Sequence, residues 1–126
     1  MTDAPRKLLV VDDQPDVCWA LQRVLSLHGI DSEAAASAGE ALEKMRRERF
    51  PVVFVDAKLP RMDGMELAEK LRSLDRDVFI VMVSGYYYED DREVRSALEE
   101  GRIQAFLAKP FDNETVVKVV RKAGVK

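Results

Sequence analysis

The chain has little of the residue chemistry that marks disulfide-stabilised, zinc-binding and membrane proteins. Its 126 residues include one cysteine, Cys18, and one histidine, His28, which excludes an internal disulfide and a cysteine–histidine zinc site. No uninterrupted apolar stretch approaches the roughly 20 residues that a transmembrane helix needs. There is no signal-like N-terminal segment, so we expect a cytoplasmic protein without a membrane span, in which Cys18 is a packed helix thiol.

Charge of one sign is also missing. The chain carries 20 basic and 23 acidic residues, distributed along its length, for a net charge of -3. This balance argues against nucleic-acid binding through bulk electrostatics and favours a protein or a small anion as partner. A length of 126 residues predicts a single domain over 1–126, long enough to bury a sizeable core.

Short apolar runs alternate with helical patterns, which is typical of repeated βα units around a parallel sheet. We expect strands at about 8–11, 31–35, 52–55, 79–84 and 105–108. Helices are expected from Pro15 to Gly29, after Ser37, after Asp63, at about 91–100, and after Asp112 or Asn113. The predicted buried positions of the first and third helices are Val17, Leu21, Val24, Leu25, Leu27, Leu67, Leu71 and Leu74.

The third strand predicts how the sheet is arranged. Val52 to Val55 are all apolar, so this strand is central and covered on both faces. We therefore expect an α/β, flavodoxin-like, doubly wound (βα)5 fold with strand order 2-1-3-4-5. In that order the crevice opens between the first and third strands, which brings Asp12, Asp13 and Asp56 together.

Three crowded carboxylates repel one another unless a cation neutralises them. With oxygen donors alone, the site suits Mg²⁺ together with a phosphate. Lys109 and Ser84, at the ends of the fifth and fourth strands, supply an ammonium and a hydroxyl, and Asp56 can act as a nucleophile toward phosphorus. As alternatives, Asp12 or Asp13 caps the first helix, Ser84 begins a turn, and Lys109 is a solvated surface residue.

Four segments in this order resemble the receiver domain of bacterial two-component response regulators, over about residues 6–124. The segments are Asp12-Asp13, Val55 to Gly64, Ser84-Gly85, and Phe106 to Phe111 with its Lys109-Pro110 pair. The resemblance implies that Asp56 is the phosphate acceptor. It also implies that Asp12, Asp13 and Asp56 bind Mg²⁺, with Lys58 contributing its backbone carbonyl.

The resemblance further implies that Ser84 and Lys109 hold the phosphoryl group, and that Phe106 is an aromatic switch residue; the alternative is that Phe106 is simple core. The donor would be a phosphohistidine on a sensor histidine kinase or a phosphotransfer protein. Phosphorylation would alter the face formed by the fourth helix, fifth strand and fifth helix. That face would bind an output domain or partner protein, or form a homodimer.

Other functions stay open on the sequence alone. The chain could be a receiver-like module that never takes phosphate, or a flavin carrier or conventional enzyme on the same fold. In the favoured case it assists its own phosphorylation and hydrolysis and is not a turnover enzyme. It could stand alone or belong to a larger regulator. We also expect Tyr86 and Lys58 to flank the phosphate and control water access, and Trp19 to be a candidate fluorescent reporter or an ordinary half-buried residue.

Overall fold

A computed structural model of the chain describes residues 7–85 and 91–125; Tyr86 therefore lies outside the described residues. A five-stranded parallel sheet has the order β2-β1-β3-β6-β7, which confirms the predicted order 2-1-3-4-5. Its strands are β1 (Leu8–Val11), β2 (Ser32–Ala35), β3 (Val52–Asp56), β6 (Phe79–Ser84) and β7 (Ala105–Ala108). The helices are α1 (Pro15–Leu27), α2 (Ala38–Arg47), α3 (Gly64–Leu74), α4 (Arg92–Glu99) and α5 (Asn113–Lys122).

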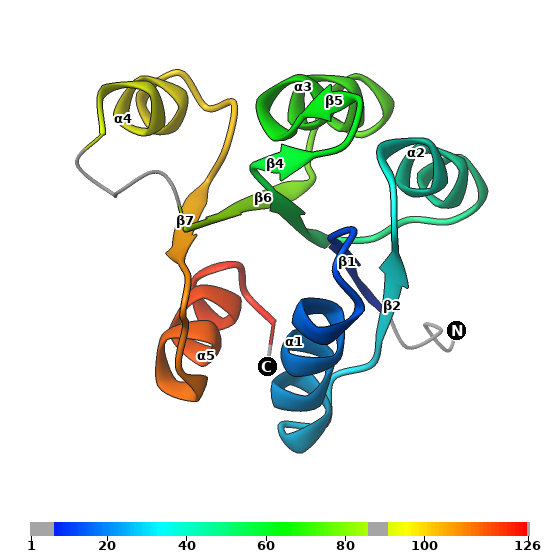
Figure 1. The fold of residues 1–126 in the computed structure, drawn as a ribbon, viewed down its shortest axis with the longest axis vertical. Coiled ribbons are helices and arrows are strands. Elements are labelled where there is room, and N and C mark those ends of the chain that lie inside the picture. The colour runs from blue at the N-terminus through cyan, green and yellow to red at the C-terminus, as the bar shows by residue number, and fades with distance from the viewer. Residues whose placement is uncertain (1–6, 86–90, 126) are drawn as a thin grey trace.

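The helices cover both faces of the sheet. In Figure 1, α2, α3 and α4 lie on one face, and α1 and α5 lie on the other. Alternate strand residues point to opposite faces, so Leu9 and Val11 pack in the core under α2, α3 and α4, whereas Leu8 and Val10 pack against α1 and α5. Within residues 7–85 and 91–125, no helix is both long enough and apolar enough to cross a membrane.

The central strand is β3, paired with β1 on one side and β6 on the other. All of its residues are buried, from Val52 to Asp56. Burial on both faces explains its unbroken apolar run, because each face lies under helices. The strand delivers Asp56 to the carboxyl end of the sheet.

Helix starts follow the predicted side-chain caps with one exception. Ser37 accepts from the backbone N–H of Glu40, and Asp112 accepts from that of Thr115. The exception is α1, whose N-cap is Gln14 without a side-chain cap, so the alternative that Asp12 or Asp13 caps this helix is wrong. The acidic pair is thereby left for another role.

Two predicted core positions are wrong, and one element was not expected. Leu27 is 62% exposed and Leu74 is 44% exposed, since both lie at the last residue of their helices, beyond the edge of the core. A small antiparallel hairpin, β4 (Lys58–Leu59) with β5 (Met62–Asp63), stands between β3 and α3. Arg61 in its turn has a φ of 68° without being glycine, so the usual turn signal is absent.

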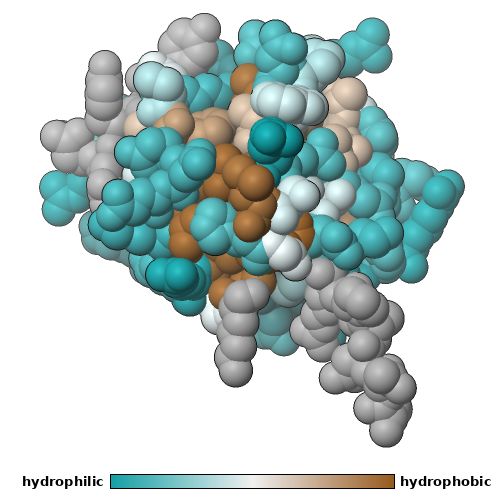
Figure 2. Space-filling view, turned by 90° about the horizontal axis from the view of Figure 1, so that it is seen from below, coloured by the Kyte–Doolittle hydropathy of each residue, from teal (hydrophilic) through white to brown (hydrophobic). Residues whose placement is uncertain are grey.

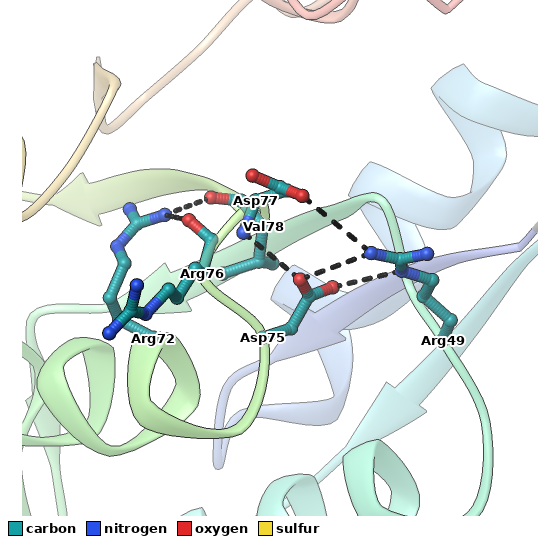
Figure 3. A network of polar contacts seen from close by, with 6 residues as sticks. All are labelled: Arg49, Arg72, Asp75, Arg76, Asp77 and Val78. Atoms are coloured by element: carbon teal, nitrogen blue, oxygen red, sulfur yellow. Dashed lines mark hydrogen bonds and ion pairs between the residues drawn. The ribbon is translucent and has the colours of Figure 1, made fainter.

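Polar contacts tie the loops together at the amino end of the sheet (Figure 3). The Arg49 guanidinium contacts both carboxylate oxygens of Asp75, at 3.2 and 3.4 Å. Arg72 of α3 donates to the carbonyls of Arg76 and Val78, and to the side-chain oxygen of Gln104 at 2.6 Å. These bonds fix the loops that enter β3, β6 and β7.

Candidate functional site

The polar residues that follow the apolar strands gather at the carboxyl end of the sheet. Asp12 and Asp13 follow β1, Asp56 is the last residue of β3, Ser84 is the last residue of β6, and Lys109 follows β7. Three of them are almost fully buried: Asp12 is 2% exposed, Asp56 7% and Ser84 1%. Polar side chains this deeply buried are stable only when they have partners.

Lys109 is the cation at the centre of this site. Its Nζ lies 3.2 Å from Oδ2 of Asp12 and 3.4 Å from Oδ1 of Asp56, bridging two residues from separate segments of the chain. The backbone N–H of Lys109 donates to the carbonyl of Ser84 at 2.9 Å. This bond holds the residue against β6, and the Lys109–Pro110 peptide bond that follows is cis.

The carboxylates are also held by the backbone. Asp12 accepts a hydrogen bond from the N–H of Gln14 at 2.9 Å, and Asp56 accepts one from the N–H of Lys58 at 3.4 Å. Asp13 is exposed, yet one carboxylate oxygen each from Asp12, Asp13 and Asp56 lie within 4.8 Å of one another. The site therefore brings three carboxylates together, two of which contact the Lys109 ammonium.

Burial and the excess of negative charge together shift the pKa values of Asp56 and Lys109. Burial raises the pKa of Asp56, and the neighbouring Asp12 carboxylate raises it further, while Lys109 opposes the shift. For Lys109, burial alone would lower the pKa, but Asp56 and Asp12 outweigh it and the pKa is raised. Lys109 stays charged, and its effect on Asp56 is outweighed by burial together with Asp12.

Gly64 is a residue of this site that sequence reasoning did not single out. Its N–H donates to the carbonyl of Ala57 at 2.9 Å, so α3 begins directly against the end of β3. A Cβ at position 64 would lie 2.5 Å from the Asp56 carbonyl oxygen and 2.7 Å from the Ala57 Cα. Only glycine fits here, and the Asp63-Gly64 dipeptide was the available signal.

Two further predicted residues flank the centre. Lys58 is exposed and begins β4, paired with Asp63 of β5, which places its backbone two residues past Asp56. Phe106 of β7 is half-buried and packs against the core under α2, α3 and α4. Trp19 is 64% exposed, and the Arg23 guanidinium carbon lies 5.7 Å from its ring centroid, so the half-buried alternative is wrong.

The donor set fits a hard divalent cation. The converging groups are carboxylate oxygens, and Cys18 is buried with its Sγ 3.4 Å from the Asp12 carbonyl, as expected of a packed thiol. Oxygen-only sites with several carboxylates suit Mg²⁺ better than Zn²⁺. A dianionic phosphoryl group at this site would share the positive charge of Lys109 with the carboxylates.

Known proteins with this architecture were found by sequence and by structure. The family model for the response regulator receiver domain matches residues 8–121. Sporulation initiation phosphotransferase F of Bacillus subtilis is 31% identical over 92% of this chain and 91% of its own length. The transcriptional regulatory protein DctD of Rhizobium meliloti is 33% identical over the whole chain, which spans 26% of that protein.

The structural comparison agrees. Chemotaxis protein CheY4 of Vibrio cholerae superposes with a TM-score of 0.85 at 29% identity, over 95% of this chain and 99% of that one. A CheY-like receiver domain protein from Methanospirillum hungatei gives a TM-score of 0.84 at 29% identity, over 94% and 93%. The chain belongs to the response regulator receiver domain family of two-component systems.

Proposed function

We propose that Asp56 accepts a phosphoryl group from a phosphohistidine on a sensor histidine kinase or phosphotransfer protein. The observation that carries the proposal is the ammonium of Lys109 between the buried carboxylates of Asp12 and Asp56. A buried site with surplus negative charge is costly in a merely structural role. It is explained if a cation and a phosphoryl group bind there.

The transfer itself asks little covalent chemistry of the protein. A carboxylate oxygen of Asp56 attacks phosphorus, the phosphorus–nitrogen bond to the donor imidazole breaks, and its electron pair returns to the imidazole nitrogen. Lys109 neutralises a phosphoryl oxygen, and the Ser84 hydroxyl donates to another. Water later attacks phosphorus, the bond from phosphorus to the Asp56 oxygen breaks, and inorganic phosphate leaves, which regenerates the carboxylate. The chain thus assists its own phosphorylation and hydrolysis without being a turnover enzyme.

Mg²⁺ would be held by Asp12, Asp13, Asp56 and the backbone carbonyl of Lys58. The bound ion would neutralise both the carboxylates and the phosphoryl oxygens. Asp12 and Asp56 approach it from buried positions and Asp13 from an exposed one. A bound Mg²⁺ would keep waters on the side of the exposed Asp13, as this ion usually does.

The consequence of phosphorylation would be a change at the face formed by α4, β7 and α5. Ser84 would move toward the phosphoryl group and Phe106 would turn inward. Only Val94 and Ala97 of α4 are fully buried, which supports α4 as the element that shifts between two states. This face would bind an output domain, a partner protein or a second copy of the chain, with residues 1–126 acting as one cytoplasmic receiver unit.

The test is phosphorylation by acetyl phosphate with MgCl₂, followed by intact-protein mass spectrometry. The parent should gain one phosphoryl group, and Asp56→Asn should gain none. Asp63→Asn is the matched control, because Asp63 is an exposed carboxylate that caps α3 through the Met65 N–H and lies outside the carboxylate cluster. A parent that stays unmodified, also with a competent kinase, would show a binding module that never takes phosphate.

The same assay tests Lys58 as a control on water access. Its position two residues past Asp56, with an exposed side chain, supports this role. Lys58→Ala should shorten or lengthen the phosphoryl half-life without preventing phosphorylation. A half-life equal to that of the parent would remove Lys58 from this role, and the Tyr86→Ala protein tests the partner position.

A further inference from the structure

An apolar cavity lies between α1 and α5, away from the carboxylate site. Its volume is about 110 Å³. Figure 2 shows hydrophobic residues gathered on this face and surrounded by hydrophilic ones. The apolar residues that line the cavity are Val24, Leu25, Ile30, Val117, Val120 and Val125.

A second, polar hollow of about 400 Å³ adjoins this cavity along α5. The two hollows share His28, Val117 and Arg121 as lining residues, and the second adds Lys118. Asn113 and Glu114 complete its lining. The combined surface, which we call the α1–α5 groove, has an apolar end and a rim with two permanent positive charges against one negative charge.

The cations of this rim are not neutralised by a carboxylate in direct contact, although Lys118 acts on Asp112 at longer range. Among the described residues, neither Lys118 nor Arg121 forms an ion pair, in contrast to Lys44, whose Nζ lies 2.9 Å from Glu33. The Nδ1–H of His28 donates to the Val24 carbonyl at 3.0 Å, since a carbonyl only accepts. Its other ring nitrogen, Nε2, is left to contact a ligand. The positive rim contrasts with the net charge of the whole chain, which is -3.

The size of the cavity determines what it can hold. An apolar cavity of about 150 Å³ accommodates benzene, whereas pockets for whole small-molecule ligands are about 300–1,000 Å³. The apolar end therefore takes one side chain, and the open polar hollow takes the chain on either side of it. This is the arrangement of a protein interface, with one buried anchor and a charged rim.

We propose that the α1–α5 groove binds an acidic peptide segment of a partner protein, with one aliphatic side chain in the cavity and flanking carboxylates against Lys118 and Arg121. Burial of the aliphatic group supplies affinity, and the positive rim selects acidic sequences. The groove does not include Asp56 or Lys109. Its occupancy is thus separate from the proposed phosphorylation.

The test uses a synthetic pentapeptide with a central leucine between two pairs of glutamates, blocked at both ends. It is titrated into ¹⁵N-labelled Asp56→Asn protein, so that failure of phosphorylation and failure of this proposal are distinguishable. Amide signals of the groove should shift, those of His28, Ile30, Val117 and Val125 most. A peptide with serine in place of leucine should bind about tenfold more weakly, as expected for loss of one buried aliphatic group.

Charge reversal provides the matched pair of variants. Arg121→Glu should weaken binding of the leucine peptide by about tenfold, because it replaces attraction with repulsion at the rim. Arg95→Glu makes the same change at an exposed position of α4, on the other face of the sheet, and should leave binding unchanged. The proposal would be overturned if both peptides bound equally, if both variants had equal effects, or if the shifts lay outside the groove. It would also be overturned if isocaproate, which carries the branched end of leucine on a free carboxylate, bound as tightly as the peptide.

Discussion

The two ends of the parallel sheet both carry polar networks, but only one has balanced charge. At the amino end, the guanidinium groups of Arg49 and Arg72 both act on the carboxylates of Asp75 and Asp77, so cations and anions are equal in number. At the carboxyl end, the Lys109 ammonium contacts two buried carboxylates, and the exposed carboxylate of Asp13 lies beside them. The comparison teaches that the amino end stabilises the fold, whereas the carboxyl end carries surplus negative charge, which the proposed Mg²⁺ and phosphoryl group would explain.

Removal of Lys109 should produce the largest effect. Lys109→Met leaves the buried Asp12 and Asp56 carboxylates without a counter-charge and should cost about 3 kcal/mol of unfolding free energy. Urea unfolding measures this loss. Mg²⁺ should recover part of it, because the ion replaces the missing charge; a variant as stable as the parent would mean that the carboxylates do not depend on Lys109.

The backbone at the carboxyl end should be nearly as sensitive. Gly64→Ala forces a Cβ against the Asp56 carbonyl and should cost about 2 kcal/mol in the same urea experiment, as overpacking does. Gly39→Ala in α2 is the control, because the nearest atom lies 4.0 Å from its Cβ. That change should raise stability by about 0.5–1 kcal/mol through helix propensity, and equal effects at the two glycines would refute the close approach.

Neutralising one carboxylate at each end should act in opposite directions. Asp56→Asn should raise unfolding stability at pH 7 by about 1 kcal/mol, since it removes a buried charge that repels Asp12. Asp75→Asn should lower the melting temperature, because it removes the partner of Arg49. Thermal unfolding by circular dichroism compares the two, and changes of the same sign would contradict the difference in charge balance.

The smallest effect is the pH dependence of these differences. The pKa of Asp56 is raised, so its folded-state penalty appears only as pH rises through its ordinary value of 3.8 and beyond. The pKa of Asp75 is lowered by Arg49, so its contribution is present above 3.8 and is lost as pH falls through the folded-state value. Both variants should therefore approach the parent in acid, and differences that persist would assign another cause.

Much of this arrangement could be predicted because it depends on short-range patterns. The unbroken run Val52 to Val55 indicates a central strand. The order of the strands then places four residues at the carboxyl edge of the sheet: Asp12, Asp56, Ser84 and Lys109. Their meeting follows from the topology of parallel sheets. The roles of these residues stay predictions until phosphorylation is measured.

The features that were missed depend on contacts between distant segments. Arg72 reaches Gln104, 32 residues along the chain, and no local pattern indicates that pairing. The β4–β5 hairpin has two-residue strands, too short for an alternating pattern, and its positive φ falls on Arg61. Glycine is required at position 64 because the backbone of Asp56 and Ala57, at the end of β3, approaches the start of α3.

The most direct test of the central claim is titration with beryllofluoride and Mg²⁺, read by amide spectra of the parent and Asp56→Asn proteins. Beryllofluoride binds to a carboxylate and mimics a phosphoryl group there. Our account predicts that signals around Asp56, Ser84 and Lys109, and along α4, change in the parent only when both additions are present, and do not change in Asp56→Asn. Identical spectra for the two proteins would contradict it.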